Sequence, residues 1–330
     1  MGKSKNYQSE VELQMLVVRA FNGVRMKSYR ELTEGLCNVA YRIELEDGRA
    51  VVLKIAPGNT ECQMSYEVNM MRAEVSAMRL AQDHTDILVP RVYYYDDTKA
   101  LCSSEYFFME CLEGNSFSSI KETLSKEEME AIEYEIGQTV RRIHNLQGEK
   151  FGLLGAKESW QSEFFAYFYQ LMVGVLHDGL RKNVDIGADY EEVRNLLLRD
   201  QLVFEEVRNP VLIHWDTWEG NWFIKDKKLV GLIDWERAMW GEGLMEDRFR
   251  SHCKSESFLR GYGIESFTKA QKLRLAWYDI YLYIIMMIEG SYREYDNDGQ
   301  YQWAKKLLLP IIDQVKNAKD FIDSEQCGTV

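Results

Sequence analysis

Residues 211–247 hold oxygen-bearing side chains whose types and spacing could bind a metal ion. Asp216 and Asn221 are five residues apart in one loop, and Asp234 follows the next apolar run. If the two apolar runs between these polar positions form a hairpin, Asn221 and Asp234 lie opposite each other at its open end, with Asp216 close by. Two carboxylates and an amide are hard oxygen ligands that suit Mg²⁺.

Phosphoryl transfer uses such a set of side chains. One Asp orients the acceptor hydroxyl and takes its proton, while an Asn and a second Asp hold the Mg²⁺ ions that bridge the nucleotide phosphates. The alternative is that Asp216 and Asn221 are turn residues and that Asp234 caps a short helix. The whole pattern, His-x-Asp-x-x-x-x-Asn followed by an apolar run and Ile-Asp-Trp, favours the chemical interpretation.

A lysine far upstream provides an independent observation. Lys54 lies in the apolar run 50–55, and a lysine in a strand rich in Val and Leu can reach the α- and β-phosphates of ATP. We predict a helix over 63–81 after this strand, and Glu74 on it is the expected acidic partner of Lys54. Glu67, one heptad earlier, is the alternative partner. A solvent-facing lysine and a surface glutamate would be the plain structural interpretation.

These motifs resemble the catalytic block of the aminoglycoside phosphotransferase/choline kinase-like family, the small-molecule relatives of protein kinases. The resemblance covers roughly residues 28–303 and is strongest in 211–247. It implies an α+β, bilobal, protein-kinase-like fold, with a small β-rich N-terminal lobe and a larger, mainly helical C-terminal lobe. It also implies ATP and Mg²⁺ as cofactors and a hydroxyl group of a small molecule as the acceptor.

The resemblance also implies roles for single residues of the catalytic block. Asp216 would be the catalytic base, and Asn221 and Asp234 would be the Mg²⁺ ligands. His214 would be a structural residue of the loop, and Asp247 would match a further family Asp that braces it.

In the N-terminal lobe the resemblance concerns the nucleotide. Gly35 lies where the family has its phosphate-covering loop, although this sequence has a single glycine there. Residues 108–114 resemble the hinge, where backbone groups of Glu110 and Leu112 would pair with the adenine edge and Met109 would line the pocket.

The spacing of apolar residues changes near Gly114, and we predict a lobe over 1–114, with the hinge at its end, and a second lobe over 115–330. In the first lobe an Asp-Gly pair between two apolar runs predicts a hairpin. The elements expected there are helices at 10–21 and 63–81 and strands at 39–45, 50–55, 92–95 and 105–109. Those expected in the second lobe are helices at 126–146, 160–180, 190–207, 269–289 and 301–318 and strands at 211–213, 222–224 and 229–233.

Composition narrows the class of protein. Of 330 residues, 46% are hydrophobic and 12% aromatic, which excludes a disordered chain, and a net charge of −13 argues against nucleic-acid binding. The longest apolar stretch, 280–288, is too short to span a membrane, and the polar start of the chain lacks a signal peptide. Six scattered cysteines without a Cys-x-x-Cys pair predict reduced thiols and a cytoplasmic location. The sequence does not indicate the oligomeric state.

The acceptor is expected to be small. His-Trp-Asp replaces the His-Arg-Asp of protein kinases and no Ala-Pro-Glu segment follows, so a protein substrate is disfavoured. Clustered aromatic and acidic residues suit an amine-bearing acceptor such as an aminoglycoside or choline, although tryptophans of this kind often pack in a core. The residues concerned are Trp215, Trp218, Trp222, Trp235, Trp240, Glu219, Glu236, Glu242 and Glu246, with Asp279 and Glu289 as further contacts.

Two other functions remain open at this stage. A non-catalytic nucleotide-binding regulator would have the same fold, but it would not need the intact set Lys54, Asp216, Asn221 and Asp234. A metal-dependent hydrolase would use His214, Asp216 and Asp234, and it would leave the Lys54 strand and the hinge unexplained.

Overall fold

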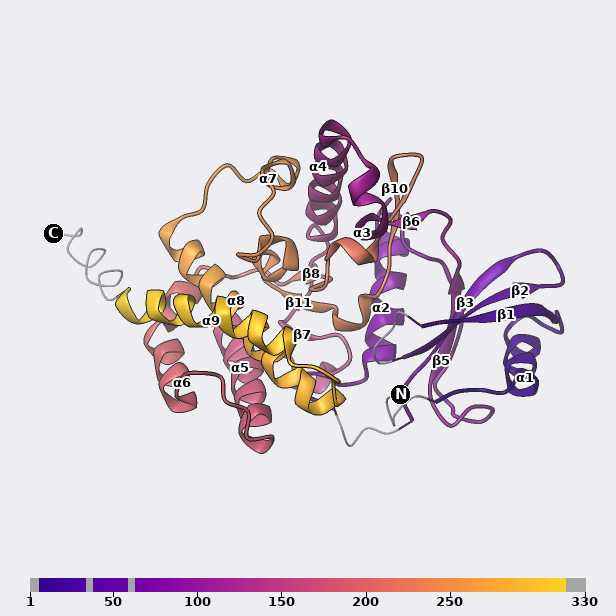
Figure 1. Ribbon diagram of the computed structural model, residues 1–330, viewed down its shortest axis with the longest axis horizontal. Helices are drawn as coiled ribbons and strands as arrows, with labels where there is room; N and C mark the ends of the chain where they lie inside the picture. Colours follow the sequence, from indigo (N-terminus) through magenta and orange to yellow (C-terminus); the bar gives the residue numbers. More distant parts are fainter. Residues whose placement is uncertain (1–5, 34–37, 59–62, 319–330) are drawn as a thin grey trace.

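The protein folds into two lobes, one built on a sheet and the other mainly of helices (Figure 1). The computed structural model describes residues 6–33, 38–58 and 63–318. This arrangement agrees with the predicted bilobal α+β fold. Helix α2 lies beside the sheet on the side that faces the helical lobe (Figure 1).

The N-terminal lobe is a five-stranded antiparallel sheet in the order β1-β2-β3-β5-β4. The predicted hairpin is present, and Gly48 adopts φ +89° in its turn, a value that glycine tolerates well. Strand β1 was not predicted because its side chains are mostly exposed, so the sequence lacks an apolar alternation there. The elements are α1 (Glu10–Ala20), β1 (Met26–Leu32), β2 (Val39–Leu45), β3 (Ala50–Ile55), α2 (Met70–His84), β4 (Val92–Asp96) and β5 (Tyr106–Glu110).

Helix α2 begins at Met70, and the prediction that it starts at residue 63 was wrong. Asn69 adopts a left-handed φ of +47°, which a helix cannot continue through. Before it, the carboxylate of Glu67 accepts the N–H of Met64 at 2.8 Å and stabilises a turn. Glu67 therefore lies outside the helix that carries Glu74.

The C-terminal lobe is mainly helical, as predicted, with small sheets near the middle of the molecule. The predicted helix 190–207 stops at Arg199 and continues as a short 3₁₀ segment, and α7 was not predicted. The helices are α3 (Phe117–Ile120), α4 (Lys126–Ile143), α5 (Phe164–Arg181), α6 (Tyr190–Arg199), α7 (Glu256–Tyr262), α8 (Lys269–Arg293) and α9 (Gly299–Asn317).

Two three-stranded sheets position the polar loops of residues 211–247. Their orders are β10-β9-β6 and β7-β11-β8, and the strands β6, β7 and β11 are too short to be seen in the sequence. The strands are β6 (Asn115–Ser116), β7 (Gly152–Leu153), β8 (Val211–Ile213), β9 (Trp222–Lys225), β10 (Lys228–Leu232) and β11 (Met239–Gly241).

The connection between the lobes is short. The chain leaves the large sheet at Glu110, and Asn115 already pairs with Ile224 of the predicted β9–β10 hairpin. The division of the chain at residue 114 lies in this connection and stays a prediction.

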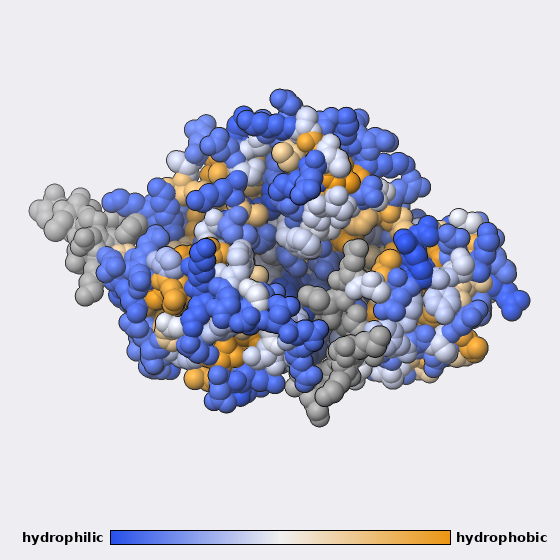
Figure 2. Space-filling model, viewed as in Figure 1, coloured by the Kyte–Doolittle hydropathy of each residue, from blue (hydrophilic) through white to orange (hydrophobic). Residues whose placement is uncertain are grey.

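Hydrophilic and apolar residues are divided between surface and core, as the composition of a folded chain leads one to expect. Hydrophilic residues cover most of the face seen in Figure 2, and this face is hollowed between the two lobes. Apolar residues of α2 and β5 belong to the same buried cluster as those of the C-terminal lobe, so the lobes are in close contact below that hollow. Among the described residues, no helix is long and apolar enough to cross a membrane.

We predict that Gly137→Ala destabilises the protein because α4 and α7 approach each other closely at this glycine. An added Cβ at Gly137 would lie 2.2 Å from the carbonyl oxygen of Phe258. We expect a loss of about 1–3 kcal/mol in the free energy of unfolding, measured by urea denaturation.

The matched control is Gly290→Ala in α8. Its Cβ would have no neighbour closer than 3.4 Å, so the higher helix propensity of alanine should leave stability unchanged or raise it by up to about 1 kcal/mol. Equal stability of the two variants would contradict the predicted close packing.

Candidate active site

Lys54 of β3 joins three elements of the molecule. Its Nζ lies 2.7 Å from Oε1 of Glu74 on α2 and 2.7 Å from Oδ1 of Asp234, which follows β10. The structure thus places Lys54 against Glu74, the first of the two predicted partners. Glu67 lies elsewhere and pairs with Arg293 at 2.8 Å.

The charges around Lys54 do not balance. Glu74, Asp234 and Glu236 have carboxylate oxygens within 4.8 Å of one another, and one ammonium group lies among them. Burial raises the pKa of Glu74 and of Glu236 to about 7, with the neighbouring carboxylates adding to the rise. Burial would also raise the pKa of Asp234, but Lys54 lowers it below its usual value. The cluster therefore carries excess negative charge that a bound cation would offset.

Asp234 and Asn221 come together at the open end of the β9–β10 hairpin, as predicted. The N–H of Ile233 donates to the carbonyl oxygen of Asn221 at 3.0 Å, and the Asn221 amide donates to the carbonyl oxygen of Asp216 at 2.8 Å. The Asp234 side chain is 34% exposed, so a metal ion could reach it. Carboxylate and amide oxygens in a region of excess negative charge fit Mg²⁺.

The loop that carries Asp216 is held by a buried glutamate. Glu246 is fully buried, and its carboxylate accepts the N–H groups of His214 at 2.6 Å and of Trp215 at 2.8 Å. Trp215 adopts φ +72°, a value that is uncommon for a large side chain. The hydrogen bonds that these two N–H groups donate to the carboxylate stabilise this backbone.

The prediction that Asp247 braces this loop was wrong, because the bracing residue is its neighbour Glu246. Asp247 points to a different group, the imidazole of His252, at 3.4 Å. Both residues are acidic and adjacent, and no spacing rule in the sequence distinguishes them.

His214 is a structural residue, as the resemblance implied. Its Nδ1 accepts the N–H of Asp216 at 3.2 Å and its Nε2 donates to the carbonyl oxygen of Ile233 at 2.9 Å. Burial lowers the pKa of His214, which agrees with the neutral tautomer that these two bonds require. Both ring nitrogens are engaged, so His214 is not available as a metal ligand.

Asp216 is partly buried, and its carboxylate is available. Burial raises its pKa to about 7. In residues 6–33, 38–58 and 63–318, no protein group donates a hydrogen bond to this carboxylate. Its oxygens can therefore accept a proton from a hydroxyl group brought to them.

The predicted adenine contacts lie on the last strand of the large sheet and just beyond it. Met109 is buried, and the N–H of Glu110 donates to the carbonyl oxygen of Arg91 at 2.8 Å. Glu110 therefore has only its carbonyl oxygen to offer to an adenine amine. Leu112 lies against Gly231 of β10, where an added Cβ would come within 2.5 Å of the leucine side chain.

Gly35 lies outside the described residues, but Asn38 at the start of β2 is described. Its side-chain amide donates to Oε2 of Glu236 at 2.8 Å and so links the two lobes. Asn38 was not predicted as a site residue, and its position beside the expected phosphate-covering loop was the one available signal.

Most of the residues predicted to contact the acceptor are buried or already paired with other side chains. Trp215, Trp222, Trp235 and Trp240 are buried, and only Trp218, at 50% exposure, presents its ring to solvent among the five clustered tryptophans. The acidic residues are also engaged: Glu219 pairs with Lys121, Glu242 with Arg274, Glu246 with the loop, Asp279 with Arg250 at 3.5 Å and Glu289 with Arg237 at 3.1 Å. Glu236 accepts the Asn38 amide and lines a small cavity with Arg237.

Arg237 was also missed by the sequence analysis. Its guanidinium group lies over the rings of Tyr66 and Trp215, at 5.5 and 5.2 Å from their centroids. These three side chains line a small cavity next to the loop that carries Asp216. Arg237 directly follows Asp234-Trp235-Glu236 in the sequence, but its contacts with Tyr66 and Trp215 arise only in the folded chain.

Structures already known share this fold. A protein designated a fructosamine-3-kinase from Thermobifida fusca has a TM-score of 0.66 at 16% identity, over 90% of this chain and 98% of its own. A thermostable mutant of aminoglycoside phosphotransferase APH(4)-Ia, in complex with ADP and hygromycin B, has a TM-score of 0.65 at 15% identity, over 92% and 98% of the two chains. The streptomycin–ATP complex of APH(2″)-IIa has 0.61 at 14%, over 92% and 97%.

At these identities the likeness shows the fold alone, which is that of kinase-like small-molecule phosphotransferases. No curated protein matches the sequence. The model of the phosphotransferase enzyme family, however, matches residues 28–246, a range that holds Lys54, Glu74, Asp216, Asn221 and Asp234. The chain therefore belongs to the phosphotransferase enzyme family.

Proposed function

We propose that this phosphotransferase is an ATP- and Mg²⁺-dependent kinase that transfers the γ-phosphoryl group to a hydroxyl of a small molecule. The observation that carries the proposal is the contact of Lys54 with both Glu74 and Asp234. A lysine held in this way offers a fixed ammonium group to phosphates, beside an aspartate that could bind their metal ion.

The N-terminal lobe would bind the nucleotide. The carbonyl oxygen of Glu110 would accept from the adenine amine, the N–H of Leu112 would donate to the ring, and Met109 would line the pocket. Lys54 would contact the α- and β-phosphates, while Glu74 holds its side chain in place. Gly35 would lie in the loop over the phosphates.

Asn221 and Asp234 would hold Mg²⁺, which when bound neutralises charge on the phosphate oxygens. Asp216 would orient the acceptor hydroxyl and accept its proton as the oxygen attacks. The brace from Glu246 keeps the Asp216 backbone in place, which favours catalysis by positioning.

The acceptor is proposed to be a small alcohol that carries an amine. Aminoglycosides are bound in two of the similar structures, but the residues of this chain support the amine only in part. Glu236, the exposed ring of Trp218 and the net charge of −13 favour a cation near the hollow. The reaction is proposed to take place in the cytoplasm, in agreement with the scattered cysteines.

The alternatives are less well supported. A hydrolase would need His214 as a metal ligand, and both ring nitrogens of this residue are engaged in internal hydrogen bonds. A nucleotide-binding regulator would not require an available carboxylate at Asp216. The variants below distinguish a regulator from an enzyme.

We predict that Asp216→Asn abolishes transfer and leaves Mg-ATP binding intact, because this side chain acts on the acceptor. Loss of a general base should lower kcat by roughly 10²-fold or more, measured by coupled ADP release. Asp226→Asn, in the exposed β9–β10 turn, is the matched control and should retain full activity. A kcat of the Asp216 variant within about threefold of the wild type would contradict the assignment.

We predict that Asp234→Asn removes the Mg²⁺ dependence of ATP binding. Asp234 adopts φ +70°, which asparagine tolerates and alanine does not, so the variant changes the charge without straining the backbone. Calorimetric titrations with ATP, with and without Mg²⁺, provide the measurement. Asp226, also left-handed at φ +50°, offers Asp226→Asn as control. An unchanged response to Mg²⁺ would mean that Asp234 serves only to hold Lys54.

A third prediction concerns the charge of the acceptor. Its kcat/KM, measured at saturating Mg-ATP, should fall as ionic strength rises from about 0.01 to about 0.15 M, because the Debye length shrinks from about 30 to about 8 Å. Aminoglycosides, choline, ethanolamine and fructosamines are the compounds to screen first. An uncharged best acceptor, or a kcat/KM that is constant with salt, would refute the amine and leave the kinase proposal in place.

A further inference from the structure

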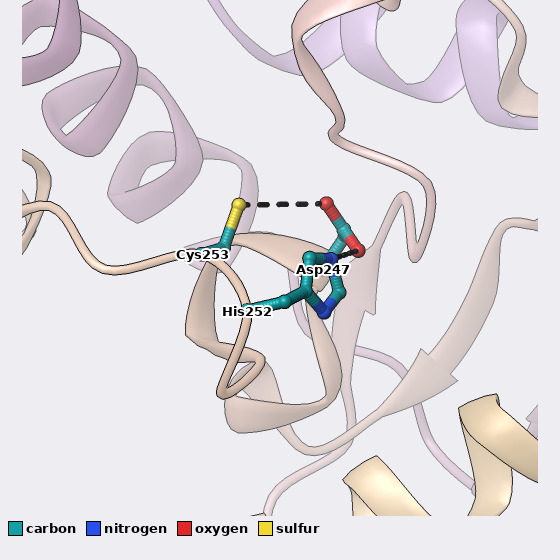
Figure 3. Close-up of side chains that lie close together, drawn as sticks. All are labelled: Asp247, His252 and Cys253. Atoms are coloured by element: carbon teal, nitrogen blue, oxygen red, sulfur yellow. Dashed lines mark hydrogen bonds and ion pairs between the residues drawn. The ribbon is translucent and has the colours of Figure 1, made fainter. Parts of the chain in front are cut away.

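A second group of metal-ligating side chains lies away from Lys54, in the segment between β11 and α7. Asp247 is at the start of a 3₁₀ turn, and His252 and Cys253 follow in the loop after it. The three side chains lie close together (Figure 3), with one ligand atom of each within 4.8 Å of the others. This group was not predicted from the sequence, because adjacent His and Cys residues do not match the usual zinc spacings.

We infer that Asp247, His252 and Cys253 form a binding site for a divalent transition metal, with Zn²⁺ as the best fit. Nε2 of His252 is 3.4 Å from Oδ1 of Asp247, and Sγ of Cys253 is 4.0 Å from Oδ2. Tetrahedral Zn²⁺ with its usual bonds to O, N and S separates its ligands by about 3.3–3.8 Å. The 3.4 Å and 4.0 Å distances involve different oxygens of Asp247, and one ligand atom from each residue lies within 4.8 Å of the others. Side-chain movements of up to about 1 Å would bring them to tetrahedral spacing, and water would complete the coordination.

The histidine is already oriented for this role. Its Nδ1 lies 3.0 Å from the hydroxyl of the buried Tyr283, which leaves Nε2 turned towards Asp247. The Tyr283 hydroxyl also contacts Oγ of Ser251 at 2.8 Å. A hydrogen bond to the second ring nitrogen is the usual support of a metal-binding histidine.

The charges and the exposure around these three residues are compatible with a bound cation. Two positive residues adjoin the group in the chain. Arg248 follows Asp247, and its charge is compensated by Glu133 and by Glu219 at 3.9 Å. Lys254 follows Cys253 and is exposed to solvent, which screens its charge. Asp247 is 8% exposed, while His252 is exposed and gives solvent a path to the site. The mixed oxygen, nitrogen and sulfur ligands select a borderline metal over Mg²⁺. On binding, the Cys253 thiol gives its proton to solvent and coordinates as the thiolate.

The same three residue types occur in cysteine nucleophiles, but the order in space is different. In such a triad the histidine lies between the thiol and the carboxylate. Here Asp247 lies between Cys253 and His252 (Figure 3). Burial also raises the pKa of Cys253 to about 11, which opposes a free thiolate.

The test is a titration of the full-length, chelator-treated protein with Co²⁺ as a spectroscopic substitute for Zn²⁺, in excess Mg²⁺. We expect one equivalent to bind with a thiolate-to-cobalt charge-transfer band in the near ultraviolet, and Zn²⁺ to displace it. Cys253→Ser should lose the band. His252→Asn should weaken Co²⁺ binding by roughly tenfold or more, and Tyr283→Phe, which removes the support of the histidine, by roughly tenfold.

His177→Asn is the matched control, because His177 is exposed on α5 and far from the group in sequence. Its affinity and band should equal those of the wild type. With Mg²⁺ in excess throughout, Zn²⁺ should also raise the Tm of the wild type and not that of Cys253→Ser. The absence of a charge-transfer band in the wild type, its persistence in Cys253→Ser, or equal weakening by His177→Asn would each overturn the inference.

Discussion

The site depends on one ion cluster, in which the ammonium group of Lys54 contacts Glu74 and Asp234 at 2.7 Å each. The three residues come from β3, from α2 and from the segment after β10, so the cluster sets the position of the helix between the lobes. A buried charge is costly unless it is paired, and removing Lys54 would leave both carboxylates without this partner. The sheet, the helix and the hairpin are therefore constrained to meet at this point.

The second constraint is the backbone conformation at and beside the proposed functional residues. Trp215 and Asp234 both adopt left-handed φ values, and each lies beside or at a proposed functional residue. Such conformations persist only where the surroundings enforce them. Glu246 does so for the loop that carries Asp216, and Lys54 does so for Asp234. The proposed functional residues are thus positioned by hydrogen bonds and ion pairs of buried side chains rather than by the loops themselves.

The sequence predicted the parts of this arrangement that leave a local pattern. The β2–β3 and β9–β10 hairpins, Lys54 in its strand and the His-x-Asp loop all have short-range signals. Strand β1 was missed because its side chains are exposed, and helix α2 was started too early because Asn69 breaks it without Gly or Pro. The choice between Asp247 and Glu246 needed the tertiary contact, and so did the finding that four of the five clustered tryptophans are buried.

The short strand β6 has a mechanical consequence. Glu110 is fixed in the large sheet and Asn115 is paired with Ile224 of the hairpin, so a rotation of one lobe against the other can bend this connection only at residues 111–114. Gly114 adopts φ +111°, and a Cβ there would lie 2.4 Å from the carbonyl oxygen of Ile224. The residues that can bend are therefore four and adjoin the proposed adenine contacts, so a nucleotide bound there as proposed would restrict a rotation of one lobe against the other.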